Sequence, residues 1–244
     1  MRGLVALLAT GALTSCSILS QELELEPWEN MKAGAHSVGF STGWAWDEAQ
    51  VILDDKSGEP DLGKGSATTD LDPIAGGGLK YSYNVTDNFA IGAIAEFRTF
   101  DPDPVAPLDS VLDADEYTSY HYLLTTRFFT EPFGKDNRLR LFAGLDLGWV
   151  DSIELNATVI YAPGVFERVT VQGDAFWTIA PVIGGQWLIT DRLTLDFGAF
   201  YEWGIENTND TVQLNIPIAG DVNDVDGALD IQGFFIAGGL SYYL

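Results

Sequence analysis

Cysteine, basic residues and long apolar runs are all scarce in this chain of 244 residues, and each scarcity excludes something. The single cysteine, Cys16, rules out an intramolecular disulfide. Only 12 Lys and Arg stand against 36 Asp and Glu, and the net charge of −24 disfavours binding to nucleic acid. Beyond the N-terminal region, no run approaches the ~20 apolar residues that a spanning helix needs. If the chain crosses a membrane, it must do so as a closed β-barrel, because only helices and barrels satisfy every backbone polar group in lipid.

Sequence motifs for common chemistry are also missing. The chain has no Gly-rich phosphate loop, no zinc-ligand spacing and no nucleophile elbow. The acidic segment 221–227 resembles an EF-hand only loosely, because Val225 takes a ligand position and no Glu follows at the twelfth. We therefore predict no cofactor and no defined metal site, with diffuse binding of divalent cations by the acidic loops as an alternative.

What the chain does contain is a strict alternation of apolar and polar residues. Between residues 193 and 203, the odd positions carry Leu, Leu, Phe, Ala, Tyr and Trp, and the even positions carry Thr, Asp, Gly, Phe and Glu. A period of two predicts a β-strand. The apolar face would point to the core of a soluble sandwich, whereas in an outer-membrane barrel it would face lipid and the polar face would line the lumen.

The same alternation predicts eight strands, over about residues 33–53, 73–84, 89–98, 117–130, 139–149, 169–189, 193–203 and 228–244. Pro181, inside the sixth strand, indicates a bulge or locally weakened pairing. Three short connections, near 85–88, 131–138 and 190–192, alternate with four long polar ones, at about 54–72, 101–116, 162–164 and 207–226. An even number of antiparallel strands with alternating short and long connections is typical of outer-membrane barrels.

The residues near the ends of the strands indicate a barrel that lies in a membrane. Aromatic residues gather there on the apolar face, as expected for interfacial girdles: Trp44, Trp46, Tyr81, Tyr83, Trp149, Trp187, Trp203 and Tyr242. The chain ends in a strand with apolar residues at 236, 240, 242 and 244. This resembles the C-terminal insertion signal of outer-membrane barrels, although Leu244 replaces the usual Phe.

From about residue 33 to 244, the sequence resembles the eight-stranded outer-membrane barrels of the OmpA, OmpX and OmpW type. The resemblance implies an all-β fold, an antiparallel up-and-down transmembrane barrel, in the outer membrane of a bacterial cell. It implies little about activity, because the class includes structural anchors, adhesins, narrow channels and lipid A enzymes.

The N-terminus predicts export. One early Arg, a short apolar run and the small residues after it indicate a secretory signal over residues 1–15. Residues 13–16, Leu-Thr-Ser-Cys, resemble the lipobox of bacterial lipoproteins, which implies cleavage before Cys16 and acylation of its thiol. An ordinary signal peptide with an incidental cysteine is the alternative. Residues 16–32 are then expected to be a periplasmic tether, and residues 33–244 the barrel.

With the polar face turned inward, the lumen would hold nearly balanced charges: Asp47, Glu96, Asp146, Asp196 and Glu202 with Lys80, Arg98, Arg127 and Arg140. The interior of an eight-stranded barrel is just wide enough for side chains to fill, and buried charges must be paired. The main interpretation is a plug of ion pairs that makes the barrel rigid. The alternative is a narrow or gated path for ions or small solutes along the same residues.

The leading functional prediction is a structural or narrow porin-like role, in membrane integrity or passive passage. Adhesion or surface recognition through the acidic outer loops is an alternative. Catalysis is not expected: Ser119 and His121 share a strand face, but they stand in the reverse order to the residues of lipid A deacylase barrels and point to the lumen. The predicted partners are outer-membrane lipid and lipopolysaccharide, and the chain is expected to be a monomer.

Overall fold

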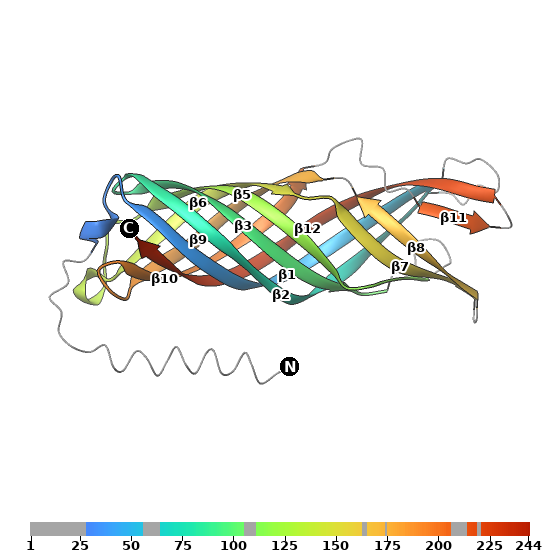
Figure 1. Cartoon of the computed structure of the whole chain (residues 1–244), viewed down its shortest axis with the longest axis horizontal. Helices are drawn as coiled ribbons and strands as arrows, with labels where there is room; N and C mark the ends of the chain where they lie inside the picture. The colour runs from blue at the N-terminus through green and yellow to red at the C-terminus, as the bar shows by residue number, and fades with distance from the viewer. Residues whose placement is uncertain are drawn as a thin grey trace, which may run out of the picture.

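A computed structural model describes residues 28–55, 64–104, 111–162, 165–173, 175–205, 214–218 and 221–244. Eight antiparallel strands form the wall of a barrel: β1 (His36–Asp55), β2 (Lys64–Thr86), β3 (Phe89–Pro102), β5 (Tyr117–Phe129), β6 (Leu139–Val150), β9 (Phe176–Leu188), β10 (Leu193–Ile205) and β12 (Asp221–Tyr243). Each strand pairs with the next, and β1 also pairs with β12, so the sheet closes on itself (Figure 1). The predicted eight-stranded up-and-down barrel is confirmed.

Three short turns join the wall strands at one end of the barrel, at residues 87–88, 130–138 and 189–192. The second contains a 3₁₀ helix, η2 (Lys135–Asn137), and it turns through positive φ angles at Gly134, Asp136 and Asn137, residue types that tolerate this conformation. The described N-terminal segment and the C-terminus lie at this same end (Figure 1).

The long connections carry strands that the sequence did not predict. β4 (Val111–Ala114), β7 (Ile153–Ala162) and β8 (Val165–Gly173) form a separate three-stranded sheet, and β11 (Leu214–Ile218) pairs with the beginning of β12. The prediction of one strand over 169–189 was wrong. Residues 165–173 pair with 153–162 in a hairpin of their own, and the wall strand begins only at Phe176.

The wall strands also extend into three of the predicted loops; into the loop predicted over 101–116, β3 continues as far as Pro102. β1 continues to Asp55 and β2 begins at Lys64, inside the loop predicted over 54–72. Strand β12 begins at Asp221, inside the loop predicted over 207–226. The reason is that these polar residues continue the backbone pairing that the apolar residues begin. For example, Asp55 on β1 pairs with Val225 on the neighbouring strand β12.

Pairing around Pro181 is weakened on one side only. Leu145 on β6 stays opposite Pro181, whereas the pairs between β9 and β10 lapse between Val182–Phe200 and Ile179–Trp203. They resume in the same register, so there is no bulge. Proline has no backbone N–H to donate, which accounts for the local loss of pairing.

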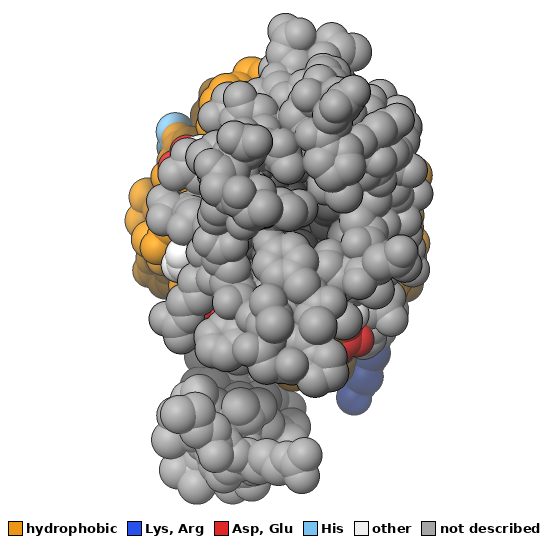
Figure 2. Space-filling view, turned by 90° about the vertical axis from the view of Figure 1, so that its right-hand side faces the viewer, with side chains coloured by type: hydrophobic (Ala, Val, Ile, Leu, Met, Phe, Trp, Pro, Cys, Tyr) orange, Lys and Arg blue, Asp and Glu red, His pale blue; other side chains and the backbone are white. Residues whose placement is uncertain are grey.

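The apolar faces point away from the barrel, as predicted. Leu79 and Ile183 are 72% and 66% exposed, whereas the polar Thr194 on the opposite face is 0% exposed. Figure 2, a view from the end with the long connections, shows hydrophobic side chains on the flanks of the molecule. A closed barrel with an apolar exterior is suited to lipid, because lipid replaces the water that such a surface avoids.

Negative charge is concentrated toward the long connections. The ranges 47–72, 101–116, 151–174 and 206–230 contain 24 of the 36 acidic residues but only three of the 12 basic ones. Within the described residues, no helix is both long and apolar enough to cross a membrane.

The end of the predicted tether packs against the barrel. Trp28 and Met31 are buried; Trp28 immediately precedes a 3₁₀ helix, η1 (Glu29–Met31), and Met31 is the last residue of that helix. The barrel domain therefore begins no later than Trp28, and not at residue 33, because these apolar side chains are packed in its mouth. The predicted signal, Cys16 and the tether before residue 28 lie outside the described residues.

Candidate functional site

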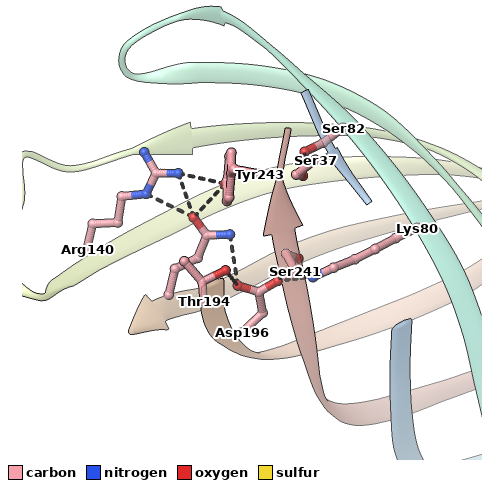
Figure 3. Close-up of polar contacts among 9 residues, drawn as sticks. Ser37, Lys80, Ser82, Arg140, Thr194, Asp196, Ser241 and Tyr243 are labelled. Carbon is pink, nitrogen blue, oxygen red and sulfur yellow. Dashed lines mark hydrogen bonds and ion pairs between the residues drawn. The ribbon is translucent and has the colours of Figure 1, made fainter. Parts of the chain in front are cut away.

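Asp196 on β10 is the centre of a polar cluster in the part of the lumen nearest the short turns (Figure 3). Its carboxylate accepts hydrogen bonds from side chains of four strands: Lys80 Nζ, Gln186 Nε2 (2.9 Å), Thr194 Oγ1 (2.8 Å) and Ser241 Oγ (2.5 Å). Asp196 itself is 8% exposed. A buried carboxylate is tolerated only when it is paired and hydrogen-bonded, and these contacts meet that requirement.

Arg140 on β6 lies beside this cluster. Its Nε and Nη2 donate to Gln186 Oε1 at 2.9 and 2.6 Å, and Nη2 donates to the Tyr243 hydroxyl at 3.1 Å (Figure 3). The guanidinium carbon lies 3.9 Å from the ring centroid of Phe129 and 4.5 Å from that of Trp28. Among the described residues no carboxylate forms an ion pair with Arg140, so an amide, a hydroxyl and two aromatic faces satisfy its charge.

Arg127 and Asp146 form a second ion pair, between neighbouring strands β5 and β6. The guanidinium contacts both carboxylate oxygens, with Nη2 2.9 Å from Oδ2. The Arg127 guanidinium carbon also lies 5.5 Å from the ring centroid of Phe142. Bidentate pairing of this kind is among the stronger charge-assisted contacts in proteins.

A third group of charges, centred on Arg98, lies closer to the long connections. Arg98 pairs with Glu96 on its own strand and with Glu202 on β10. Glu202 also accepts a hydrogen bond of 2.6 Å from Thr178 Oγ1. The Arg98 guanidinium carbon lies 4.0 Å from the ring centroid of Phe235. One cation thus serves two carboxylates, of which Glu202 is buried and Glu96 partly buried.

Eight of the nine charged residues predicted for the lumen have described side chains. They comprise four cations and four carboxylates. Seven of them are joined in three groups: Lys80 with Asp196, Arg127 with Asp146, and Arg98 with Glu96 and Glu202. The eighth, Arg140, is held by polar uncharged groups. The ninth, Asp47, lies on β1 opposite Gly233 and Leu71, but its side chain is outside the described set.

Ser119, His121 and Glu202 form a contact that resembles a hydrolase triad in its order of groups. Ser119 Oγ lies 2.8 Å from His121 Nε2, and Nδ1 of the same ring lies 3.7 Å from Glu202 Oε1. A triad requires an exposed nucleophile beside a substrate site. These three side chains are at most 5% exposed, and neither lumen cavity described below is lined by Ser119 or His121. The arrangement is therefore a buried polar contact.

Described residues line two cavities within the lumen. The larger, of about 130 Å³, is lined by charged residues of both signs, among them Lys80, Glu96, Arg127, Asp146 and Asp196. The smaller, of about 40 Å³, lies between Glu96, Arg98 and the ring of Phe235. A buried water needs about 10–15 Å³ of such volume and two to four polar partners, so the larger cavity has room for several waters. Within the described residues, no group of acidic, histidine or cysteine side chains is placed to hold a metal ion.

Apolar layers lie on both sides of the polar groups. The layer toward the long connections, here called the aromatic layer, consists of Ala45, Phe100, Tyr117, Val150, Phe176 and Phe235, with Phe200 packed against it. Phe200 and Phe235 stack with ring centroids 4.7 Å apart. The layer toward the short turns, here called the short-turn layer, consists of Trp28, Met31, Leu188 and Tyr243.

These layers are the part of the site that the sequence analysis missed. Phe200 was predicted on the polar, inward face without a role, yet an aromatic residue at a lumen position is a signal for an apolar layer. Trp28 and Met31 had been assigned to the tether. Two bulky apolar residues three positions apart in an acidic stretch could have indicated that this segment packs against the barrel.

Comparison with known proteins identifies the fold. No family model and no curated protein matches the chain. The outer membrane protein OprG from Pseudomonas aeruginosa is similar in structure, with a TM-score of 0.61 and 15% identity over 87% of this chain and 97% of that one. Neisserial surface protein A covers 86% of this chain and 98% of its own at 15% identity, with a TM-score of 0.39. The outer membrane protease OmpT of Escherichia coli covers 92% and 99% at 10% identity, with a TM-score of 0.45. The similarity to OprG concerns the fold alone, which is that of the small bacterial outer-membrane barrels.

Proposed function

We propose that this chain, an eight-stranded outer-membrane β-barrel, is a structural membrane protein whose lumen is closed in its resting state. One observation carries the proposal. An open, water-filled pore would leave its lining exposed, whereas the lumen residues Arg98, Arg140, Asp146 and Glu202 are only 3% to 6% exposed. The side chains themselves occupy the space through which a solute would have to pass.

The layered arrangement of the lumen supports the same proposal. An ion entering from either end would first meet an apolar layer, where Val150 at one end and Leu188 at the other are 1% and 0% exposed. It would then have to replace contacts within ion pairs that are already satisfied. Separating a buried pair leaves desolvated charges without their partners, so spontaneous opening of the whole path would be rare.

A second candidate is a narrow, gated path, and the larger cavity favours it. Its lining carries both positive and negative groups and has room for water. In this candidate, the cavity holds water or a small ion between the aromatic layer and the short-turn layer, which close the path on either side. Surface recognition through the acidic long connections stays a prediction, because those segments lie largely outside the residues with described side chains.

Single-channel recording in a planar bilayer separates the two candidates. The refolded parent chain and a Glu96→Gln, Asp146→Asn double variant would be compared at the same lipid composition and salt concentration. A closed structural barrel predicts no steady conductance from the parent. Steady, cation-selective conductance that the double variant alters would refute the closed barrel and favour the gated path, since both substituted carboxylates line the cavity.

A further inference from the structure

The segment from Trp28 to Ala35 occupies the mouth of the barrel at the short-turn end. Although this segment precedes the first strand, Trp28 and Met31 are only 6% and 1% exposed. They pack with Leu188 and Tyr243, the last residues of two wall strands, and Ala35 covers the cluster. Side chains of this size are seldom buried outside a core, so the segment belongs to the closed lumen and is not an extension of the chain into solvent.

Hydrogen bonds tie this segment to all three short turns. Each turn accepts one bond: Asn137 O from the Trp28 indole, Asp191 O from the Asn30 amide at 3.3 Å, and the Asp87 carboxylate from the Ala33 backbone N–H at 2.8 Å. The three turns join six of the eight wall strands. The segment therefore lies across the opening and is not attached to one side of it.

Contacts toward the interior connect the segment to the polar lumen. Asn84, which is 2% exposed, donates a side-chain hydrogen bond to Met31 O, and Gly34 N–H donates to Asn84 O at 2.7 Å. The indole ring of Trp28 covers the guanidinium of Arg140. Gly34 has a φ of +90°, which favours glycine and lets the chain reverse from the mouth into β1.

We propose that residues 28–35 are a stopper, a detachable segment of the chain that seals the lumen from water at the short-turn end. The inference rests on the proposed closed lumen and names the element that closes it on this side. Strand β1 is held by a continuous ladder to β12 and by a ladder to β2 that is interrupted between Thr42 and Asp47. The stopper is held by two apolar side chains and a few single hydrogen bonds, so it can leave the mouth while the barrel stays intact.

Access of a water-soluble reagent to the lumen tests the stopper without requiring conductance. In a Cys16→Ser background, Ser82→Cys places a thiol at the larger cavity, where the Ser82 hydroxyl hydrogen-bonds Ser37 Oγ at 2.7 Å. The rate of modification by a charged methanethiosulfonate would be measured in three proteins. These are the background chain, a Trp28→Ala, Met31→Ala variant that loosens the stopper, and a Glu29→Ala, Lys32→Ala control.

The control substitutes the exposed side of the same segment. The side chains of Glu29 and Lys32 are 56% and 61% exposed and pair with each other on the outside. We expect modification to be at least tenfold faster in the Trp28, Met31 variant and unchanged in the control. Resistance to unfolding in cold detergent confirms that each barrel is intact.

Two outcomes would overturn the stopper. Equal, fast modification of all three proteins would mean that the mouth is open with the segment in place. Equal, slow modification of all three would mean that deeper groups such as Arg140 form the seal. Conductance is a separate readout. Faster modification of the Trp28, Met31 variant, together with a parent that does not conduct, would support both the stopper and the closed barrel. A parent that conducts would refute the closed barrel and with it the seal, whereas equal modification rates in a parent that does not conduct would refute the stopper and leave the closed barrel standing.

Discussion

Replacing Arg98 by Met gives a sharp test of how the lumen charges are held. The substitution keeps an unbranched side chain of similar reach near Phe235 but removes the guanidinium that both Glu96 and Glu202 contact. Two carboxylates would then remain in a space where Glu202 is 4% exposed. Removing one partner of a buried pair costs about 3–5 kcal/mol, because the charge left behind is desolvated without compensation.

The free energy of unfolding would be measured by urea titration of the barrel in lipid vesicles, with tryptophan fluorescence as the signal. With a denaturant dependence of about 2 kcal/mol per M, a loss of about 4 kcal/mol moves the midpoint down by roughly 2 M. A matched triple variant, Arg98→Met with Glu96→Gln and Glu202→Gln, removes the charges on both sides. It should recover most of the loss, since uncharged replacements of a buried pair are often close to neutral.

Two results would refute this reasoning. If the single variant moves the midpoint by less than about a quarter of the expected 2 M, the carboxylates are solvated or protonated at little cost. If the triple variant is as unstable as the single one, the loss comes from the packing of Arg98 against Phe235 and not from charge. The exposed pair of Glu29 and Lys32 provides the comparison, because Lys32→Ala should leave the midpoint almost unchanged.

Two further predictions concern the membrane. Leu145→Arg places a charge on the outer face in the middle of β6, where Leu145 is 45% exposed, and should lower stability in vesicles by about 2–4 kcal/mol; the same loss in detergent and in lipid would argue against contact with the bilayer. Cys16→Ser should abolish incorporation of a labelled fatty acid during growth of an expressing bacterium, while leaving the barrel folded; no label in the parent would contradict the lipoprotein prediction.

The alternation of the sequence was sufficient to predict the wall of the barrel. Asp196 was predicted to face inward, and Leu195 and Phe197 outward, and the structure has Asp196 8% exposed and the other two 42% and 43% exposed. Local pattern is informative here because successive side chains of a strand point to opposite faces, so one residue fixes the orientation of the next. The positions of the three short turns followed from the same pattern.

The strands in the long connections could not be predicted from this alternation. Residues 153–173 alternate much as the wall does, and nothing local distinguishes a strand that continues the barrel from a hairpin that leaves it. The choice depends on which partner each strand finds, and residues 153–162 pair with 165–173 instead of extending the wall.

The sequence by itself determined the fold, the faces and the inward positions of the eight charged residues whose side chains are described, because these follow from residue type and a period of two. Only the tertiary structure decided the contacts among them. Lys80 meets Asp196 across 116 positions and Arg98 meets Glu202 across 104, since the curvature and stagger of the closed sheet bring distant strands together across the lumen. Closure of the sheet also places the three short turns around one opening of the barrel. Trp28 is buried only because this opening exists.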